Sequence, residues 1–190
     1  MTFLHRYLFF AMWASWGAYW LALWLNVKAN ARREPLASRL LHIVPLMLAF
    51  LLLARPGIPV PLLRERFLPL AEWPFWIGAA ITAGGLLFAV WARVHIGRNW
   101  SGTVTIKEGH ELVTTGPYAM VRHPIYSGLL LAFVGSAAAR GEWRGVLAVL
   151  IALWALWGKL RLEERWMREQ FGEAYETYSR RVAALVPFIL

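Results

Sequence analysis

Cysteine is absent from the sequence, and its absence excludes disulfide bonds, thiolate catalysis and metal sites built on cysteine. Charge is also scarce: charged residues make up 16% of the chain, against about 25% in an average soluble domain. Hydrophobic residues make up 59% of the chain, and the mean hydropathy is +0.47. These proportions predict a protein that folds in lipid.

Acidic residues are few, with 11 against 20 basic residues and a net charge of +9. A net charge of this sign also suits a nucleic-acid-binding protein. However, most of the twelve tryptophans lie within or beside apolar runs, as is typical of side chains at a bilayer interface. We therefore predict membrane lipids as partners and no nucleic-acid partner.

The clearest membrane span covers residues 8–25, which include no charged residue. At roughly 1.5 Å per residue this run crosses most of a hydrocarbon core of roughly 30 Å. A cleaved signal peptide is the alternative, but the run is longer than the usual apolar region of such a peptide and contains four tryptophans. A retained helix is therefore favoured.

Four further apolar stretches follow, at residues 40–54, 73–91, 125–139 and 146–157. Together with the first they predict an all-α, multi-pass membrane protein with about five transmembrane helices. The last two stretches form either two full spans or a tight helical hairpin. Pro45 is expected to bend the second stretch, and the proline-rich segment 54–73 is expected to be an irregular loop.

Basic residues are distributed unequally between the two sides that five spans create. Fourteen of the twenty lie on the side that holds the connection 93–123 and the tail after residue 157. Since basic loops stay in the cytoplasm, this predicts an outside N-terminus, a cytoplasmic C-terminus and a cytoplasmic active site. Residues 161–181 of the tail are predicted to form one amphipathic helix, with Gly172 as a candidate interruption. The alternative to a role in the site is an interfacial helix that lies on anionic lipid.

The connection 93–123 is longer than most loops in compact proteins, as functional loops often are. Arg122 and His123 precede Pro124, which suits the first turn of a helix. A helix start offers spare amide donors, which suit a carboxylate such as the amino-acid end of S-adenosylmethionine. The alternative is that Arg122 and His123 only anchor the chain at lipid head groups.

A second polar cluster follows the fifth stretch: Lys159, Arg161, Glu163, Glu164 and Arg165. Adjacent residues on a helix point about 100° apart. One of the two carboxylates could therefore turn towards a cofactor while the other faces solvent. The alternative is a solvated run of charges with i to i+4 ion pairs.

The motif Gly-Pro-Tyr-Ala-Met-Val-Arg-His-Pro-Ile-Tyr-Ser-Gly occupies residues 116–128. It is followed by Glu163-Glu164, Phe171-Gly172, Tyr175, Tyr178 and Arg181-Val182. This order and spacing resemble the isoprenylcysteine carboxyl methyltransferase family, with looser similarity to the phospholipid N-methyltransferases. The resemblance covers residues 93–187 and divides the chain into N-terminal scaffold helices, 1–92, and a methyltransferase core, 93–190.

The resemblance implies that the core binds S-adenosyl-L-methionine. The implied cofactor-binding residues are His110, Glu111, Leu112, Val113, Gly116, Tyr118, Arg122, His123, Pro124, Ile125, Tyr126 and Glu163. The implied catalytic residues are Lys159 and Arg161, facing the substrate, and Arg181, bracing the tail. An amine acceptor would also need a base, for which Glu164 and His123 are candidates. Lys159 stands where eukaryotic members have arginine, which weakens the case for bidentate recognition of a carboxylate. Ala183 replaces the usual proline.

These features predict an integral membrane methyltransferase, similar to isoprenylcysteine carboxyl O-methyltransferases, that acts on a lipophilic small molecule or lipidated substrate. N-methylation of a phospholipid or another amine is the first alternative. A non-catalytic scaffold or transporter subunit is the second. A metal oxidoreductase using His95, His110 and His123 is disfavoured, because no histidine pair has the spacing of helical ligands.

Overall fold

The computed structural model describes residues 3–23, 30–55, 59–100, 105–107 and 112–187. Its helices are α1 (Phe3–Leu23), α2 (Leu36–Ala54), α3 (Pro61–Arg64), α4 (Glu72–Ile96), α5 (Pro124–Arg140), α6 (Trp143–Phe171) and α7 (Glu173–Arg181). Two 3-10 turns, η1 (Gly97–Asn99) and η2 (Gly116–Ala119), and two short strands, β1 (Asn30–Arg33) and β2 (Thr105–Lys107), complete the order. The predicted all-α class is confirmed.

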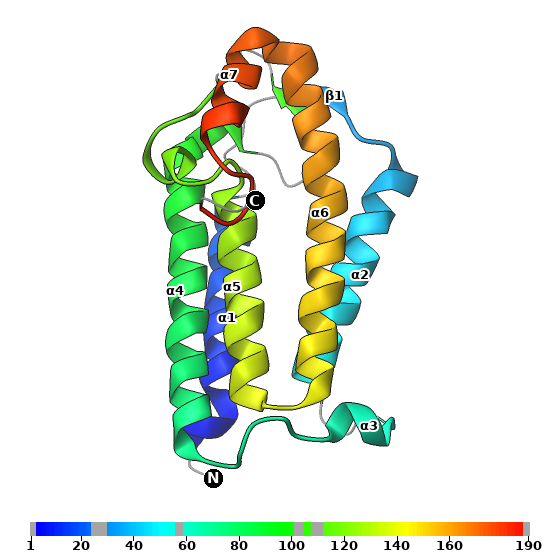
Figure 1. The fold of residues 1–190 in the computed structure, drawn as a ribbon, viewed down its shortest axis with the longest axis vertical. Helices are drawn as coiled ribbons and strands as arrows, with labels where there is room; N and C mark the ends of the chain where they lie inside the picture. Colours follow the sequence, from blue (N-terminus) through cyan, green and yellow to red (C-terminus); the bar gives the residue numbers. More distant parts are fainter. Residues whose placement is uncertain (1–2, 24–29, 56–58, 101–104, 108–111, 188–190) are drawn as a thin grey trace.

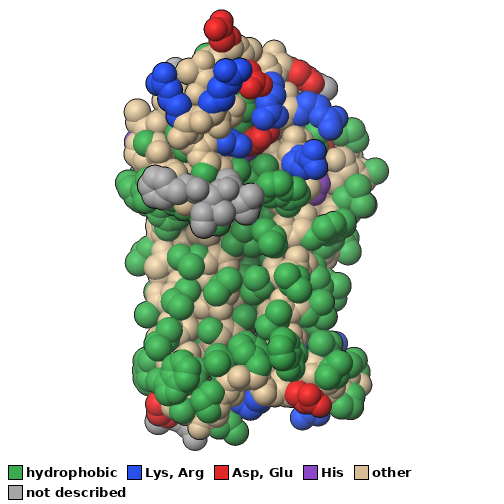
Figure 2. Space-filling view, in the orientation of Figure 1, with side chains coloured by type: hydrophobic (Ala, Val, Ile, Leu, Met, Phe, Trp, Pro, Cys, Tyr) green, Lys and Arg blue, Asp and Glu red, His purple; other side chains and the backbone are tan. Residues whose placement is uncertain are grey.

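The long helices α1, α2, α4, α5 and α6 run side by side along the molecule (Figure 1). Each of the five apolar stretches is helical where the structure describes it, with residues 24–25 of the first outside the described residues. Helices α2, α4 and α6 are long and apolar enough to cross a membrane. Helix α1 has 21 residues and α5 has 17. Hydrophobic side chains cover the middle of the face shown in Figure 2, while charged side chains gather at both ends. The molecule is therefore an α-helical membrane protein.

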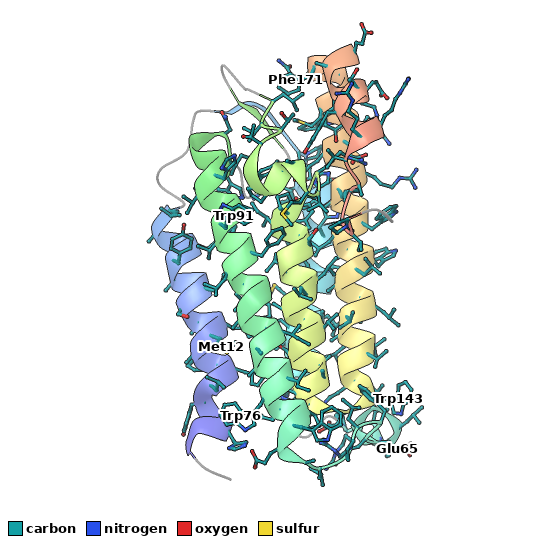
Figure 3. All side chains as sticks on the ribbon, turned by 60° about the vertical axis from the view of Figure 1, so that its left-hand side comes forward. Met12, Glu65, Trp76, Trp91, Trp143 and Phe171 are labelled. Atoms are coloured by element: carbon teal, nitrogen blue, oxygen red, sulfur yellow. The ribbon has the colours of Figure 1, made fainter. Side chains whose placement is uncertain are left out.

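Exposed tryptophans mark the two ends of this apolar region. Trp76 and Trp143 lie near the lower end and Trp91 near the upper end (Figure 3), and each is close to half exposed. Aromatic side chains at two levels are typical of the two interfaces of a bilayer.

Helices α4 and α5 approach each other at backbone distance, because glycines face each other along their contact. A Cβ atom added at Gly85 would lie 2.5 Å from the carbonyl oxygen of Gly128, and one at Gly78 would lie 2.4 Å from that of Gly135. Thr82 lies between these levels and donates to the Gly78 carbonyl at 2.8 Å. Small residues and short polar side chains allow this close packing in membranes.

Helix α6 is longer than the fifth apolar stretch, and here the prediction of a single tail helix over 161–181 is wrong. The span continues without interruption to Phe171, since residues 158–171 include no proline and many strong helix formers. Gly172 has a φ of 50°, so it ends α6, and α7 begins at Glu173. The predicted interruption at Gly172 is confirmed.

The antiparallel pairing of β1 with β2 was not predicted. These segments of four and three residues are too short to show the alternation that identifies a strand. The pair joins the N-terminal region to the connection between α4 and α5. One smaller difference also appears: α3 lies inside the expected irregular loop. Pro45 lies inside α2, which is continuous from Leu36 to Ala54, and the expected bend there stays a prediction.

Candidate functional site

The histidine motif and the paired glutamates meet at the upper ends of α5 and α6 (Figure 1). His123 is the N-cap residue of α5, and its Nδ1 lies 3.6 Å from Glu163 Oε2. Its Nε2 lies 3.4 Å from Glu164 Oε1. The Tyr126 hydroxyl donates to Glu163 Oε1 at 2.6 Å, and the Tyr126 ring stacks on His123 at 5.5 Å between centroids. His123 therefore lies between two carboxylates.

Glu164 is buried and Glu163 is partly buried, so the expectation that one carboxylate of the pair faces solvent is wrong. The Glu164 side chain is 8% exposed, against 23% for Glu163. Arg122 donates from Nε to Glu164 Oε1 at 2.7 Å, and Arg168 donates at 3.3 Å. Arg122, in the turn before α5, pairs with Glu164 from outside α6, whereas Arg168 pairs with it from one turn further along α6, as the predicted i to i+4 ion pairs require.

The segment after α7 folds back beside the upper end of α5 (Figure 1). The Arg122 guanidinium donates to the carbonyls of Ser179 and Val182. The backbone amides of Arg122 and His123 donate to the carbonyls of Ala183 and Ala184 at 2.8 and 3.0 Å. Arg181 was expected to brace this tail, but Arg181 is exposed and Arg122 makes these bonds.

The two basic residues expected to face a substrate are placed differently. Lys159 Nζ lies 5.3 Å from the centre of the Tyr126 ring and 4.0 Å from Glu163 Oε1. Arg161 is exposed. Lys159 is therefore part of the cluster and Arg161 is on the surface.

The turn η2 packs Tyr118 into the apolar cluster that contains Tyr126, and the conformation of this turn depends on Gly116. This glycine has a φ of 59°, and a Cβ atom there would lie 2.6 Å from the His95 ring. His95 also hydrogen-bonds with Thr115 Oγ1 at 2.9 Å and stacks against Tyr118. Gly116 is therefore required by the backbone and by the packing of His95.

The remaining expected cofactor residues differ in their burial. Pro124 and Ile125 are buried, and Leu112 and Val113 are partly buried. His110 and Glu111 lie outside the described residues.

Titration in the site is dominated by burial and by the two glutamates. Burial lowers the pKa of His123, but Glu163 and Glu164 outweigh it, so the pKa of His123 is raised above its usual value. Burial raises the pKa of Tyr118 and raises the pKa of Tyr178 to about 12. Tyr178 therefore stays protonated and donates to the Tyr118 carbonyl at 2.6 Å.

This set of groups fits S-adenosylmethionine, which carries a carboxylate, an ammonium and a sulfonium. His123 Nε2 is buried and forms no hydrogen bond within the described part of the chain. Positive and negative groups lie next to each other, with the aromatic side chains of Tyr118 and Tyr126 beside them. Such a site can bind both ends of an amino acid and place an aromatic face near a cation.

The sequence interpretation missed two buried polar residues of the N-terminal half. Glu34 and His42 are 5% and 9% exposed, and they hydrogen-bond with each other at 3.1 Å. The available signal was His42 itself. A histidine within an apolar membrane span is costly unless it has a partner, and such a residue often has a function.

Comparison with known proteins matched residues 73–174, more than half of the chain, to the sequence model of the family described as phospholipid methyltransferase. Protein-S-isoprenylcysteine O-methyltransferase B of Arabidopsis thaliana is 30% identical, over 65% of this chain and 66% of that protein. Protein-S-isoprenylcysteine O-methyltransferase of Schizosaccharomyces pombe is 34% identical, over 52% of this chain and 43% of that protein. The nickel-cobalt-cadmium resistance protein NccN of Alcaligenes xylosoxydans xylosoxydans is 36% identical, over 59% and 52% respectively.

The chain thus spans less than two thirds of the length of these relatives. The matched region runs from α4 to the start of α7 and includes both motifs that meet at the site. The resemblance to isoprenylcysteine methyltransferases is confirmed by these relatives, and the chain belongs to the phospholipid methyltransferase family.

Proposed function

We propose that this protein transfers a methyl group from S-adenosylmethionine to a lipophilic acceptor in the membrane. The observation that carries the proposal is the cluster in which His123 contacts both Glu163 and Glu164 while Tyr126 donates to Glu163. The cluster lies where α5 begins, at one end of the helical molecule (Figure 1), and on the face shown in Figure 2 the middle of the molecule is apolar and charged side chains gather at both ends. A polar cofactor can reach such a place from water and a lipid acceptor can reach it from the bilayer.

Within this proposal, different residues of the cluster bind different parts of the cofactor. His123, positively charged, and the start of α5 would bind the carboxylate, and Glu163 would bind the ammonium. Tyr118 and Tyr126 would flank the adenine or the sulfonium. Gly116, the segment 110–113, Pro124 and Ile125 would line the same site. Arg122 would hold the tail and thereby fix His123.

The bound cofactor would supply a methyl group on a positively charged sulfur, which is already activated for transfer. The protein then has to orient the two reactants and exclude water, and orientation alone is worth on the order of 7–11 kcal/mol at its upper limit. The ion pairs around His123 and the tail that covers it hold the site in one geometry before any ligand binds.

The class of acceptor has two candidates. The names of the two isoprenylcysteine O-methyltransferases indicate a carboxylate on an isoprenylated cysteine for those proteins. The description of the family indicates a phospholipid. Both are lipophilic, and both would enter sideways from the membrane. Lys159, beside Tyr126 and Glu163, would face the acceptor.

Three further expectations belong to this proposal. Residues 93–190 would form the methyltransferase core and 1–92 a scaffold, although β1 pairs with β2 across this boundary. The site and the C-terminus would be cytoplasmic and the N-terminus outside. A scaffold or transporter subunit remains the non-catalytic alternative, and it predicts no binding of the cofactor.

Methyl transfer tests the proposal directly. Purified protein in phospholipid vesicles would receive methyl-labelled S-adenosylmethionine and either phosphatidylethanolamine or N-acetyl-S-farnesyl-cysteine. We expect label in the organic phase with one of these acceptors and at least a tenfold lower rate for Glu163→Gln. Absence of transfer to either acceptor by a folded protein would contradict the proposal.

A further inference from the structure

A buried acid and a buried histidine lie at the start of α2, outside the region matched to the family. The Glu34 side chain is 1% exposed and the His42 side chain 11%. Glu34 Oε1 lies 3.1 Å from His42 Nε2 and also accepts from the Ser38 hydroxyl. A carboxylate removed from water in this way is costly unless its partners are well placed, so the pair needs an explanation.

The pair lies beside the Lys159 end of the site. Nδ1 and Cε1 of the His42 ring would be 3.7 and 3.6 Å from a Cβ atom at Gly158, the residue before Lys159. Leu46, one turn after His42, packs against the apolar cluster that contains Tyr126. The Glu34 carboxylate is also close enough to Tyr126 to act on it electrostatically.

The hydrogen bond with Glu34 decides which nitrogen of His42 is basic. A carboxylate only accepts, so His42 Nε2 donates and the lone pair of the neutral ring is on Nδ1. Among the described residues no hydrogen bond of His42 Nδ1 is found. A carboxylate behind an imidazole fixes its tautomer and stabilises its protonated form.

The other candidate bases near the site are already paired. His123 lies between two carboxylates, Glu164 is held by Arg122, and Glu163 accepts from Tyr126. His42 therefore differs from them in having a nitrogen with an available lone pair. Gly158, which lies beside this nitrogen, is exposed and carries no side chain, so this is the side from which an acceptor would have to reach Nδ1.

We propose that His42, oriented by Glu34, accepts a proton from the methyl acceptor, and that the acceptor is therefore a lipophilic amine or thiol and not a carboxylate. This inference rests on the proposed methyl transfer. The acceptor's lone pair forms a bond to the methyl carbon, and the carbon–sulfur bond of the donor breaks with its electrons staying on sulfur. The acceptor's proton passes to His42 Nδ1. A carboxylate acceptor is already ionised, so it has no proton for His42 to accept.

The test compares His42→Gln with the wild type for three acceptors in vesicles: phosphatidylethanolamine, dodecanethiol and N-acetyl-S-farnesyl-cysteine. Glutamine can still donate to Glu34 but cannot take a proton at physiological pH. We expect kcat for the amine or the thiol to fall by about 100-fold, in the range of general base catalysis. We expect the Kd for S-adenosylhomocysteine, measured by calorimetry, to stay within twofold of wild type.

His5→Gln is the matched control, because His5 also pairs with a glutamate, Glu72, at 2.9 Å but lies at the opposite end of the molecule. Its kcat and its Kd are expected to equal those of wild type. A second variant, Gly158→Leu, is expected to raise KM for the acceptor and leave the Kd for S-adenosylhomocysteine unchanged, because the new side chain covers His42 Nδ1.

Two results would overturn the inference: an unchanged kcat in His42→Gln, or transfer by wild type to the carboxylate alone. Equal losses of kcat and of S-adenosylhomocysteine binding would also overturn it, since they would show that the pair only supports the fold. Failure of the proposed function itself would look different, because the wild type would then not bind S-adenosylhomocysteine.

Discussion

Single residues in the site act through the charges that surround them. His123 is buried, and burial alone would favour its neutral form. Glu163 and Glu164 reverse this preference, so the pKa of His123 lies above the usual value. His123 is therefore a cation fixed between two anions, and its charge contributes to the stability of the site as well as to binding.

The sign of this shift predicts how stability depends on pH. A raised pKa in the folded state stabilises the protein fully below about pH 6.5, the usual pKa of histidine, and the contribution is lost as the pH rises through the folded-state value. We expect the difference in melting temperature between wild type and His123→Asn to be largest in this acidic range and to shrink as the pH rises. A difference that is constant or grows with pH would contradict the assignment.

The two glutamates are expected to differ in what their loss changes. Glu164→Gln leaves the largely buried Arg122 without its charged partner, and breaking a buried pair in this way costs about 3–5 kcal/mol. Glu163→Gln affects a more accessible group. Its main expected effect is weaker binding of S-adenosylhomocysteine, with a smaller loss of stability than in Glu164→Gln. Thermal melting and calorimetry on both variants would test this division, and the reverse order would exchange the two roles.

At the residue scale, some contacts of the site could be predicted from the sequence and others could not. Arg122, His123, Tyr126 and the paired glutamates could be singled out because motif and chemistry coincide. The burial of Glu164 could not, because it depends on the turn before α5 lying beside α6. The Glu34–His42 pair could not either, since the two residues are eight positions apart and α2 carries no family signature.

At the scale of helices and strands, hydrophobic length predicted every long helix. The sequence did not show that α6 continues past the membrane boundary to Phe171, because a change from apolar to charged residues does not break a helix. It also did not show the pairing of β1 with β2, which depends on two distant segments meeting. The helix end at Gly172 could be predicted, because a glycine after a long helix is a common stop signal.

The packing of α4 on α5 gives a prediction with a control at the neighbouring residue. Gly85→Ala places a Cβ atom 2.5 Å from the Gly128 carbonyl oxygen, whereas Gly84→Ala meets nothing within 4 Å. We expect Gly85→Ala to destabilise the protein by about 1–3 kcal/mol, as overpacking usually does. Gly84→Ala should be neutral or slightly stabilising. Melting in detergent compares the two, and equal effects would mean that the helices are not in backbone contact.

The whole molecule places its chemistry at one end of an apolar body (Figure 2). The tail, the turn η2 and the upper ends of α5 and α6 gather there, while α3 and the α5–α6 turn lie at the other end (Figure 1). This polarity suits an enzyme that meets a polar cofactor from water and a second reactant from lipid. Under the proposed function, the orientation of the protein in the membrane decides from which side the cofactor reaches the site.

The absence of cysteine allows that orientation to be measured without background labelling. Thr177 and Glu65 are exposed at the two ends of the molecule. We expect Thr177→Cys to react with a membrane-impermeant maleimide only from the cytoplasmic side and Glu65→Cys only from the outside. The opposite pattern would overturn the predicted orientation, and labelling of both from one side would overturn the spanning arrangement.

The most direct test of the central claim is equilibrium binding of S-adenosylhomocysteine to detergent-purified wild type and His123→Ala, measured by calorimetry. We expect wild type to bind and His123→Ala to bind at least tenfold more weakly while its far-ultraviolet circular dichroism stays unchanged. No binding by folded wild type would contradict a methyl-donor site and favour a scaffold or transporter subunit. Equal binding by both proteins would place the cofactor away from His123.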